Sequence, residues 1–428
     1  MRDVVLLDGF RTPFAKAGTA LARVPARELG RVAVSELLAR HGIEPHDVDD
    51  VIIGNVAGPS DSQNIARVVA LLAGIPKHVP AVTVHRNCAS GMEAIAQAYE
   101  RVASGQADLV VAGGTESMST IPLYVSHGMT RVFERAMRAK TPLQRAAAFA
   151  TVRPRDLTPR VALVEGLTDP ISGLNMGETA EVLAREFGIS REAQDDFALT
   201  SHKRAAAAME AGRLAEEIVP VFSPPYETVV AEDVGPRKGQ THEALAKLRP
   251  YFGGRAGTVT PGNACPITDG AAAILVASAE KARSLGLLPA GRIRGYAFVG
   301  LDPAHMGLGP AHATPVALQR AGVRFSDLGL IELNEAFAAQ VIANEIAMGS
   351  AAYARENLGL DAPVGDLDRS ILNVNGGAIA LGHPVGVSGA RLVLTLLREM
   401  RRRDVSLGLA TLCVGGGQGA AFVLERAA

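Results

Sequence analysis

Cys88 stands where the sequence predicts that a strand ends and a helix begins. An apolar run ends at His85, and an amphipathic helical pattern starts at Met92. The free backbone N–H groups and the positive dipole end of such a helix favour a thiolate, so we expect the pKa of the Cys88 thiol to be lowered. A strand-turn-helix elbow also presents one side chain outward. The position therefore suits a nucleophile, and a buried structural cysteine is the alternative.

His383 lies in a glycine-dense loop at residues 375–389, directly before Pro384. A proline favours an extended backbone at the preceding residue, and glycines let another segment or a ligand approach closely. An imidazole held in this way can act as a general base near neutral pH. An ordinary loop histidine is the alternative, but it does not explain the number of glycines.

Cys413 closes a predicted strand that runs into the glycine turn GGGQG at residues 415–419. Free backbone N–H groups in such a turn can bind an oxyanion, whereas an ordinary glycine-rich hairpin is the alternative. The turn lacks the GxxxxGK[ST] pattern of a phosphate-binding loop. His85 and Cys88 are three residues apart and supply at most half of a tetrahedral metal site, so we expect no metal.

The elements that must position these residues follow an α/β pattern. Short apolar runs alternate with longer helical patterns, and the alternation starts again after Arg292, which predicts two similar halves. The predicted strands are residues 4–7, 51–56, 82–85, 109–111, 258–260 and 274–277, followed by 293–299, 330–333, 371–374, 407–413 and 421–424.

A stretch of different amino-acid composition, rich in proline, arginine and alanine, separates residues 113–116 from residues 258–260, and we interpret it as an insertion. Residues 130–160 carry eight basic side chains against Glu134 and Asp156. Apolar residues from Met129 to Met137 fall at helical spacing, which predicts a basic amphipathic helix. Its basic face is solvated on its own protein, or it binds the phosphates of a ligand, a partner subunit or a membrane surface.

Composition narrows the class of protein. A chain of 428 residues predicts two or three domains. A net charge of −1 and the absence of Trp argue against nucleic-acid binding. Three cysteines without a CxxC pair argue against a disulfide framework. The sequence has no apolar stretch of membrane-spanning length and no signal-peptide pattern, so we expect a cytoplasmic enzyme.

Taken together, the motifs resemble those of the thiolase family, in the order that the family shows. They are NCASG at 87–91, NEAF at 334–337, GHP at 382–384 and CVGG at 413–416, and the resemblance runs from RTPF at 11–14 to the last strand. It implies the thiolase fold, an α/β architecture of two similar βαβαβαββ halves layered around central helices. The expected division is residues 1–120 with 256–290 for the N-terminal half, 121–255 for an inserted loop domain and 291–428 for the C-terminal half.

The activity that the resemblance implies is coenzyme A-dependent cleavage of a 3-ketoacyl-CoA to acetyl-CoA and a shortened acyl-CoA, or the reverse Claisen condensation. Cys88 would be the nucleophile, His383 would activate both Cys88 and the coenzyme A thiol, and Cys413 would move the proton on the acetyl carbon. His383 and a water held by Asn334 would stabilise one oxyanion of the reaction, and the N–H groups of Cys88 and Gly415 would stabilise the other. Asn334 could also cap the following helix.

Coenzyme A is expected as a substrate, with no permanently bound cofactor. Many relatives carry Ser where Cys265 stands and His where Asn175 stands, which puts one pantetheine hydrogen bond in doubt. Plain core packing is the alternative for the apolar residues that match the pantetheine and acyl tunnel of relatives. The residues matched to that tunnel are Met176, Phe252, Cys265, Met306 and Phe337.

Thiolases that resemble this chain form homodimers or dimers of dimers. The insertion and residues 248–250 look most like thiolase subunits that pair with a multifunctional β-oxidation subunit, although those subunits often carry His in place of Asn334. The alternatives are a short-chain acetoacetyl-CoA thiolase that works in the biosynthetic direction, and, from another class, a catalytically silent acyl-CoA-binding subunit. A ketosynthase would use a second histidine where Asn334 stands.

Overall fold

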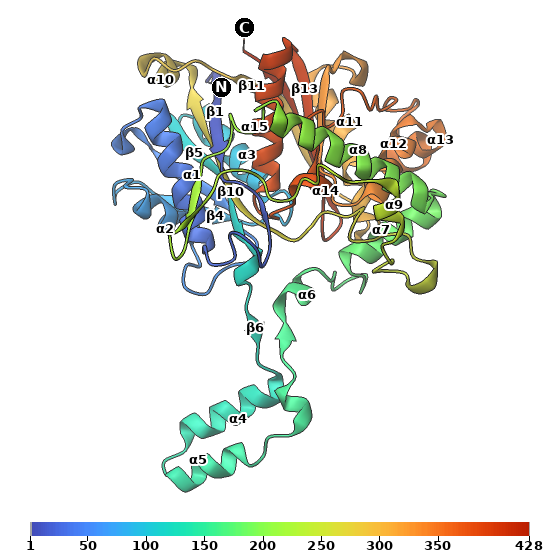
Figure 1. Cartoon of the computed structure of the whole chain (residues 1–428). Coiled ribbons are helices and arrows are strands. Elements are labelled where there is room, and N and C mark those ends of the chain that lie inside the picture. Colours follow the sequence, from blue (N-terminus) through green and yellow to red (C-terminus); the bar gives the residue numbers. More distant parts are fainter. Residues whose placement is uncertain (1, 428) are drawn as a thin grey trace.

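The computed structural model describes residues 2–427, and its centre is one mixed sheet of ten strands (Figure 1). The strand order is β12-β13-β14-β11-β1-β10-β5-β3-β4, and the short β2 pairs with β10. These strands are β1 (Val4–Arg11), β2 (Ala15–Lys16), β3 (Asp50–Gly54), β4 (Ala81–Val84), β5 (Leu109–Ser117), β10 (Thr268–Ser278), β11 (Gly291–Gly300), β12 (Leu330–Leu333), β13 (Leu407–Val414) and β14 (Gln418–Arg426).

The sheet repeats one pattern of pairing in its two halves. In the first half β3 runs parallel to β5, and β5, β10 and β1 follow as antiparallel neighbours. In the second half β12 runs parallel to β13, and β13, β14 and β11 follow as antiparallel neighbours. The halves meet where Leu6 of β1 pairs with Gly291 of β11. The two similar halves predicted from the sequence are therefore confirmed.

Helices form three layers around the two halves of the sheet (Figure 1). Alternate strand residues from both halves pack on α3 and α15, which lie between them. The other face of the first half packs on α1 and α2, and the other face of the second half on α11 and α12. The helices of the two halves are α1 (Ala26–His41), α2 (Ile65–Leu72), α3 (Ser90–Ala103), α10 (Ala279–Ser284), α11 (Gly309–Ala321), α12 (Ala338–Gly349), α13 (Ala351–Tyr353), α14 (Ala378–Leu381) and α15 (Ser388–Arg403).

Two glycines bring the N-terminal ends of α3 and α15 into contact. A Cβ on Gly91 of α3 would lie 2.7 Å from the backbone N of Ala390, and a Cβ on Gly389 of α15 would lie 2.6 Å from the backbone N of Met92. Side chains larger than hydrogen would separate the helices here. The loops that precede the two helices are the loops that carry Cys88 and His383.

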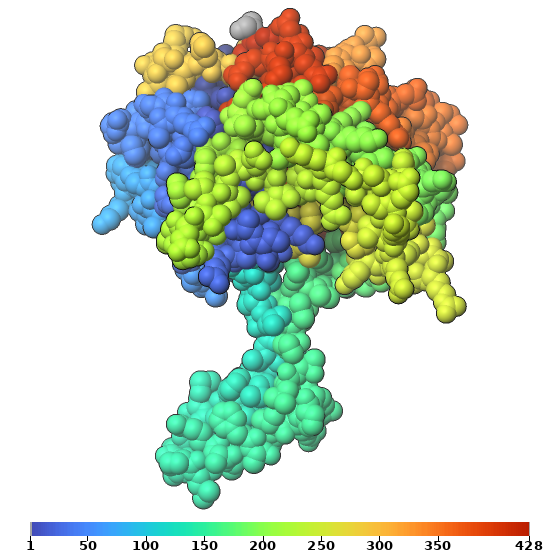
Figure 2. Space-filling view, in the orientation of Figure 1, coloured from blue at the N-terminus to red at the C-terminus, as the bar shows by residue number. Residues whose placement is uncertain are grey.

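The insertion divides into a protruding arm and a part that packs on the body. Helices α4 and α5 form a hairpin that the two-stranded ribbon β6–β7 holds away from the sheet (Figures 1 and 2). Helices α7 and α8 contact α12 and α14 of the second half. The elements are β6 (Leu123–Tyr124), α4 (His127–Arg138), α5 (Pro142–Phe149), β7 (Arg160–Val161), α6 (Ala162–Gly166), α7 (Met176–Glu186), α8 (Arg191–Glu210), β8 (Val221–Ser223), β9 (Thr228–Val230) and α9 (His242–Ala246). The domain boundaries expected from the sequence stay a prediction.

Two predicted strands are wrong, at residues 258–260 and 371–374, because side chains take the place of a neighbouring strand. The backbone N–H groups of residues 258 and 259 both donate to the carboxylate of Glu181, at 2.7 Å each. In the second segment the amide of Asn373 donates to the carbonyl of Leu333 and accepts from its N–H. Only an isolated bridge, between Leu372 and Ile331, remains there.

Arg11 ties the end of the insertion to the sheet through a buried network. Its Nε donates to Glu217 at 2.6 Å, and its two Nη atoms donate to the two oxygens of Asp233 at 2.7 Å each. All three side chains are almost completely buried. The guanidinium and both carboxylates therefore depend on one another for compensation of charge.

Replacement of Arg11 by Met should lower the free energy of unfolding by about 3–5 kcal/mol, because it leaves two buried carboxylates without their partner. Urea denaturation followed by circular dichroism measures the change. Arg2→Met is the matched control, since the Arg2–Asp108 pair is half exposed and should contribute less than about 1 kcal/mol. Equal losses in the two variants would contradict a special role for the buried network.

Candidate active site

A tight turn presents Cys88 between the end of β4 and the start of α3. Asn87 takes a left-handed conformation with φ of 43°, and its Nδ2 donates to the carbonyl of Gly415 at 2.7 Å. The Ser90 hydroxyl accepts from the backbone N of Arg86 at 2.9 Å and donates to the carbonyl of Asn87 at 2.7 Å. The predicted strand-turn-helix elbow is confirmed, and Asn87 fastens it to the glycine turn of Gly415.

The expectation of a lowered pKa for Cys88 is wrong. Burial raises the pKa of the thiol, the N–H groups of Gly415 and of Cys88 itself lower it in part, and the charge of Glu116 raises it further. Although part of the residue stays exposed, its surroundings are dense enough for burial to outweigh the N–H groups. The thiol is therefore protonated at neutral pH and needs a base to become a nucleophile.

The loop before α15 holds His383 in one defined tautomer. Its Nδ1 lies 2.5 Å from the hydroxyl oxygen of Ser388, and that hydroxyl donates to the carbonyl of Pro384 at 3.1 Å. Because the hydroxyl proton of Ser388 is used in the bond to Pro384, the hydroxyl oxygen can only accept from the ring. Nδ1 therefore carries the ring proton and donates to Ser388. The other ring atom, Nε2, is buried and has no partner within residues 2–427. Its lone pair is free to accept a proton.

His383 is also neutral. Burial, followed by the nearby charge of Arg391, lowers the pKa of the imidazole to about 4. The backbone N of His383 donates to the Thr268 hydroxyl at 3.1 Å, and Gly382 has φ of 110° in close contact with that residue. A neutral, fixed imidazole with an open Nε2 has the properties of a general base at pH 7.

Glu116, near the end of β5, binds the loop that carries His383. The sequence analysis did not identify this residue as part of the site. Its carboxylate accepts from the backbone N of Gly386 at 2.9 Å, from the backbone N of Val56 and of Ala57 at 3.0 Å each, and from Nδ2 of Asn55 at 2.9 Å. Burial raises the pKa of Glu116 to about 7 against these donors. An acidic residue at the end of an apolar strand was the available signal.

Cys413 lies at the end of β13 and is buried. Burial raises the pKa of its thiol well above the usual range, and the neighbouring thiols of Cys88 and Cys265 raise it further. The same coupling links Cys265 to Cys88, since burial and then Cys88 raise the pKa of Cys265 to about 12. Segments far apart in the sequence thus bring the three thiols into one neighbourhood.

The residues matched to the tunnel gather around Cys413. They form one apolar cluster with it, which also contains Ala180, Val259 and Ala336. A Cβ on Gly415 would lie 3.0 Å from the Sδ atom of Met176, so the cluster reaches the glycine turn. The members of the cluster that were matched from the sequence are Met176, Phe252, Cys265, Met306 and Phe337.

Asn334 follows β12 and is completely buried. Its backbone N donates to the carbonyl of Thr411 at 3.0 Å, but both its side-chain amide atoms lack a partner in the described part of the chain. The helix-cap alternative is wrong, because α12 begins at Ala338 and Phe337 occupies its N-cap. A buried amide with no protein partner implies a water or a ligand atom at this place.

Glu335 organises the loops behind Asn334 and was also missed. It accepts from the Ser201 hydroxyl at 2.6 Å, from Nδ2 of Asn373 at 2.9 Å and from the backbone N of Ile379 at 3.2 Å. Across residues 2–427 no group of three or more His, Cys, Asp or Glu side chains is arranged to hold a metal ion. None of the helices described is both long and apolar enough to span a membrane.

Comparisons with known proteins agree with this architecture. The family model "Thiolase, N-terminal domain" matches residues 4–280, and "Thiolase, C-terminal domain" matches residues 287–426. A 3-ketoacyl-CoA thiolase of Yersinia pestis is 44% identical over 423 residues, which cover 99% of this chain and 96% of the relative.

Solved structures give the same result. An acetyl-CoA acetyltransferase of Bacillus anthracis superposes with a TM-score of 0.87 at 38% sequence identity. The match covers 100% of this chain and 99% of the acetyltransferase chain. Human mitochondrial 3-ketoacyl-CoA thiolase in complex with CoA superposes with a TM-score of 0.85 at 38% identity, covering 100% of this chain and 98% of its own.

The fold and these matches define an acyltransferase. The chain belongs to the thiolase family. The family, the fold and the enzyme class predicted from the sequence are confirmed.

Proposed function

We propose that the protein cleaves 3-ketoacyl-CoA with coenzyme A, giving acetyl-CoA and an acyl-CoA shortened by two carbons, through an acyl group on Cys88. The observations that carry the proposal are the buried Nε2 of neutral His383, which has no partner among residues 2–427, and the neighbouring thiols of Cys88 and Cys413. The names of the relatives support the substrate class.

In the first half-reaction His383 Nε2 takes the proton of Cys88, and the thiolate attacks the 3-keto carbon. The N–H groups of Cys88 and Gly415 stabilise the alkoxide that forms. The bond between C2 and C3 then breaks, and its electron pair stays on C2 as the enolate of acetyl-CoA. The Cys413 thiol donates its proton to C2, which leaves acetyl-CoA, an acyl group on Cys88 and a Cys413 thiolate.

Before the second half-reaction protonated His383 passes the proton that it took from Cys88 to the Cys413 thiolate, so that both groups return to their starting forms. His383 then takes the proton of a coenzyme A thiol, the coenzyme A thiolate attacks the acyl carbonyl, and Cys88 leaves as a thiolate that takes this proton back from His383. We assign to Asn334 the task of holding a water, because its buried amide has no partner among residues 2–427. That water and His383 would stabilise the thioester oxygen of the enolate.

The apolar cluster around Cys413 fits the pantetheine arm and the start of an acyl chain, so we assign Met176, Phe252, Cys265, Met306 and Phe337 to this contact. Coenzyme A acts as a substrate, and no resident cofactor takes part in the steps above. The relatives do not favour a short-chain biosynthetic thiolase or a silent acyl-CoA-binding subunit.

We also infer that the enzyme works in the cytoplasm as a homodimer or a dimer of dimers, and that it pairs with a multifunctional β-oxidation subunit. The likeness of residues 121–255 to such thiolase subunits supports the pairing. Light scattering of the purified protein measures the oligomer. Absence of a hydratase/dehydrogenase subunit from affinity-purified native complexes would refute the pairing.

The function is tested by the coenzyme A-dependent loss of 3-keto absorbance. Purified enzyme should cleave a long-chain 3-ketoacyl-CoA with a higher kcat/KM than acetoacetyl-CoA, and acetyl-CoA should appear in equal amount. Preference for acetoacetyl-CoA would move the assignment to the short-chain enzyme. No cleavage of either substrate would support the silent subunit.

A further inference from the structure

Glu116 lies at a junction between segments that carry or support the reacting groups. It stands near the end of β5, and its side chain is almost completely buried. The loop after β3 lies on one side of the carboxylate and the loop of His383 on the other, since both donate backbone N–H groups to it. The charge of Glu116 also reaches Cys88, because it raises the pKa of that thiol. None of the reaction steps above uses this carboxylate.

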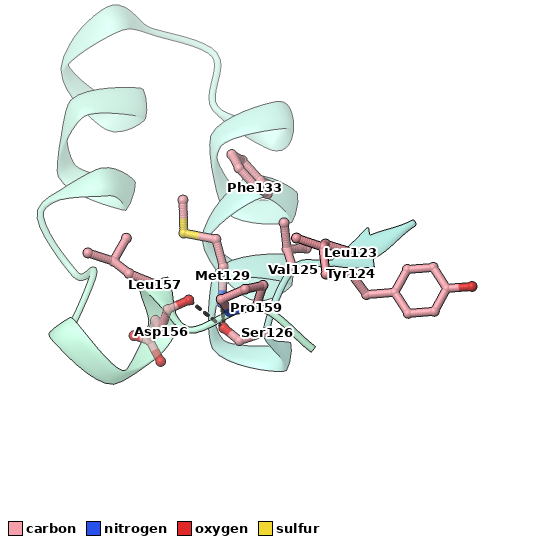
Figure 3. A pocket seen from close by; sticks show the side chains of 9 residues that line it. All are labelled: Leu123, Tyr124, Val125, Ser126, Met129, Phe133, Asp156, Leu157 and Pro159. Carbon is pink, nitrogen blue, oxygen red and sulfur yellow. Dashed lines mark hydrogen bonds between the residues drawn. The ribbon is translucent and has the colours of Figure 1, made fainter. Parts of the chain in front are cut away.

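A hollow in the arm, by contrast, offers no comparable group. It lies beside α4, has a volume of about 310 Å³ and is lined mainly by apolar side chains (Figure 3). Asp156, an acidic residue of its lining, accepts from the backbone N of Arg153 at 3.0 Å, and its carbonyl accepts from the Ser126 hydroxyl at 2.7 Å. These polar atoms hold the arm together, whereas Glu116 lies among the residues that react.

Four N–H groups converge on the two carboxylate oxygens of Glu116. Oε1 accepts from Nδ2 of Asn55 at 2.9 Å and from the backbone N of Ala57 at 3.0 Å. Oε2 accepts from the backbone N of Gly386 at 2.9 Å and from the backbone N of Val56 at 3.0 Å. An ionised carboxylate can accept all four bonds, because it has about four lone-pair positions and no proton of its own. A protonated acid would place its proton against donors and would have to release at least one of them.

Close backbone contacts leave little freedom at this junction. A Cβ on Gly114 of β5 would lie 2.1 Å from the carbonyl oxygen of Gly386. A Cβ on Gly54, the last residue of β3, would lie 2.6 Å from the backbone of Ser90 at the start of α3. The ends of β3 and β5 therefore pack directly on the loop of His383 and on the first turn of α3.

The loop after β3 also connects Glu116 to the turn of Cys88. The backbone N–H of Asn55 donates to the carbonyl of Val84 at 3.2 Å, at the point where β4 ends and the turn begins. Asn55 and Gly386 thus bond to the same carboxylate from the two sides of the site. Loss of the bonds to Glu116 would let the loop of His383 move relative to the turn of Cys88.

We propose that ionised Glu116 is a positioning residue of the thiolase reaction, which fixes the loop of His383 against the turn of Cys88 so that Nε2 can take the thiol proton. The inference deepens the proposed function and rests on it, because it needs the roles assigned to Cys88 and His383. Glu116 acts through Gly386 and the loop after β3, and it does not touch the substrate. Proton transfer requires hydrogen-bond distance, and a displacement of about 1 Å lowers a rate about hundredfold.

The surroundings of Glu116 place its ionisation near neutral pH. Burial, with a smaller contribution from the charge of Asp269 in β10, raises the pKa of Glu116 to about 7 against its N–H donors. Of the other titratable groups that face it, the Cys88 thiol has a raised pKa, and His383 has a pKa of about 4. Glu116 is therefore ionised above about pH 7 and protonated below it, so the loop of His383 should be held in place on the alkaline side only.

The experiment is the pH profile of kcat/KM for a 3-ketoacyl-CoA between about pH 5 and pH 8, which reports ionisations of the free enzyme. Chromatography of the acetyl-CoA formed gives the rate at every pH. The wild type should lose activity as the pH falls through about 7, far above the pKa of about 4 of His383. This fall should follow the protonation of a single group.

Glu116→Gln keeps the shape of the side chain but replaces one acceptor oxygen by an NH₂ group. It should lower kcat about hundredfold at the alkaline end of the profile and change KM less, because Glu116 lies outside the apolar cluster assigned to coenzyme A. Its profile should be flat. At the acid end the wild type should approach the activity of the variant, since its own Glu116 is then uncharged as well.

Two further variants separate the charge of Glu116 from general damage. Gly386→Ala keeps the carboxylate, but its Cβ would lie 2.8 Å from Oε2, so kcat should fall while the loss of activity near pH 7 remains. Asp49→Asn is the matched control at the other end of β5, where the Asp49 carboxylate accepts from the backbone N of Asp108 and of Leu109. It should keep the kcat and the pH profile of the wild type.

A wild-type profile without a fall near pH 7 would overturn the proposal. A fall that persists in Glu116→Gln would also overturn it and would assign the ionisation to Glu332, the buried partner of Arg391, whose pKa burial also raises to about 7. The acetyl adduct on Cys88 is followed in the same samples by mass spectrometry. A normal adduct with either of these profiles refutes the role of Glu116 alone, whereas absence of the adduct from the wild type refutes the reaction scheme together with it.

Discussion

Cys88→Ser should lower kcat/KM for thiolysis by a factor on the order of 10⁴ or more, because it removes the atom that carries the acyl group. A serine hydroxyl has a much higher pKa than a thiol, so His383 deprotonates it far less readily than it deprotonates Cys88. Spectrophotometric thiolysis measures the loss. Mass spectrometry of the intact protein after acetyl-CoA treatment should show an acetyl adduct on the wild type and none on the variant.

Cys265→Ser is the matched control for this prediction. Cys265 belongs to the same group of neighbouring thiols, but no step of the reaction passes through it, and serine is the residue that many relatives carry there. Its kcat should change by less than about tenfold, and the acetyl adduct should still form. An adduct that survives in Cys88→Ser and disappears in Cys265→Ser would contradict the assignment, because it would identify Cys265 as the nucleophile.

Strands such as β5 and β10 could be predicted because they are runs rich in apolar residues that are buried on both faces. The segment at 371–374 has the same composition and still fails. There the side chain of Asn373 supplies both the donor and the acceptor that a neighbouring strand would have supplied to Leu333. Periodicity reports burial, and it does not report which group completes the hydrogen bonds.

The residues of the candidate site also include some that could be predicted from the sequence and some that could not. Cys88, His383 and Cys413 could be found because glycines and a proline mark the turns that hold them. Ser388, Glu116 and Glu335 could not, since their roles depend on contacts with segments far away in the sequence.

The pKa of Cys88 was misjudged for a related reason. The sequence shows the helix end that lowers the pKa of the thiol, but it does not show the burial of the thiol in the folded protein, which raises it. Enclosure is a property of the assembled site, so only the three-dimensional structure reveals which effect is larger.

His383→Asn should lower kcat for thiolysis about 10²–10⁴-fold, the usual contribution of a positioned general base. Asparagine keeps a polar group near Ser388 but has no atom that accepts and returns a proton at neutral pH. The variant should still bind coenzyme A, so KM should change less than kcat. A loss in KM alone would mean that His383 binds the substrate and does not act as a base.

The same variant distinguishes a neutral pair from a thiolate–imidazolium pair. Burial lowers the pKa of His383 to about 4 and raises that of Cys88, so at pH 7 both groups are uncharged in the free enzyme. Alkylation by iodoacetamide requires the thiolate, and its midpoint should lie above the value of about 8.5 for a free cysteine. Because a neutral imidazole exerts no charge on the thiol, His383→Asn should leave this midpoint nearly unchanged while kcat falls. A wild-type midpoint well below neutrality that rises in the variant would instead demonstrate a preformed ion pair.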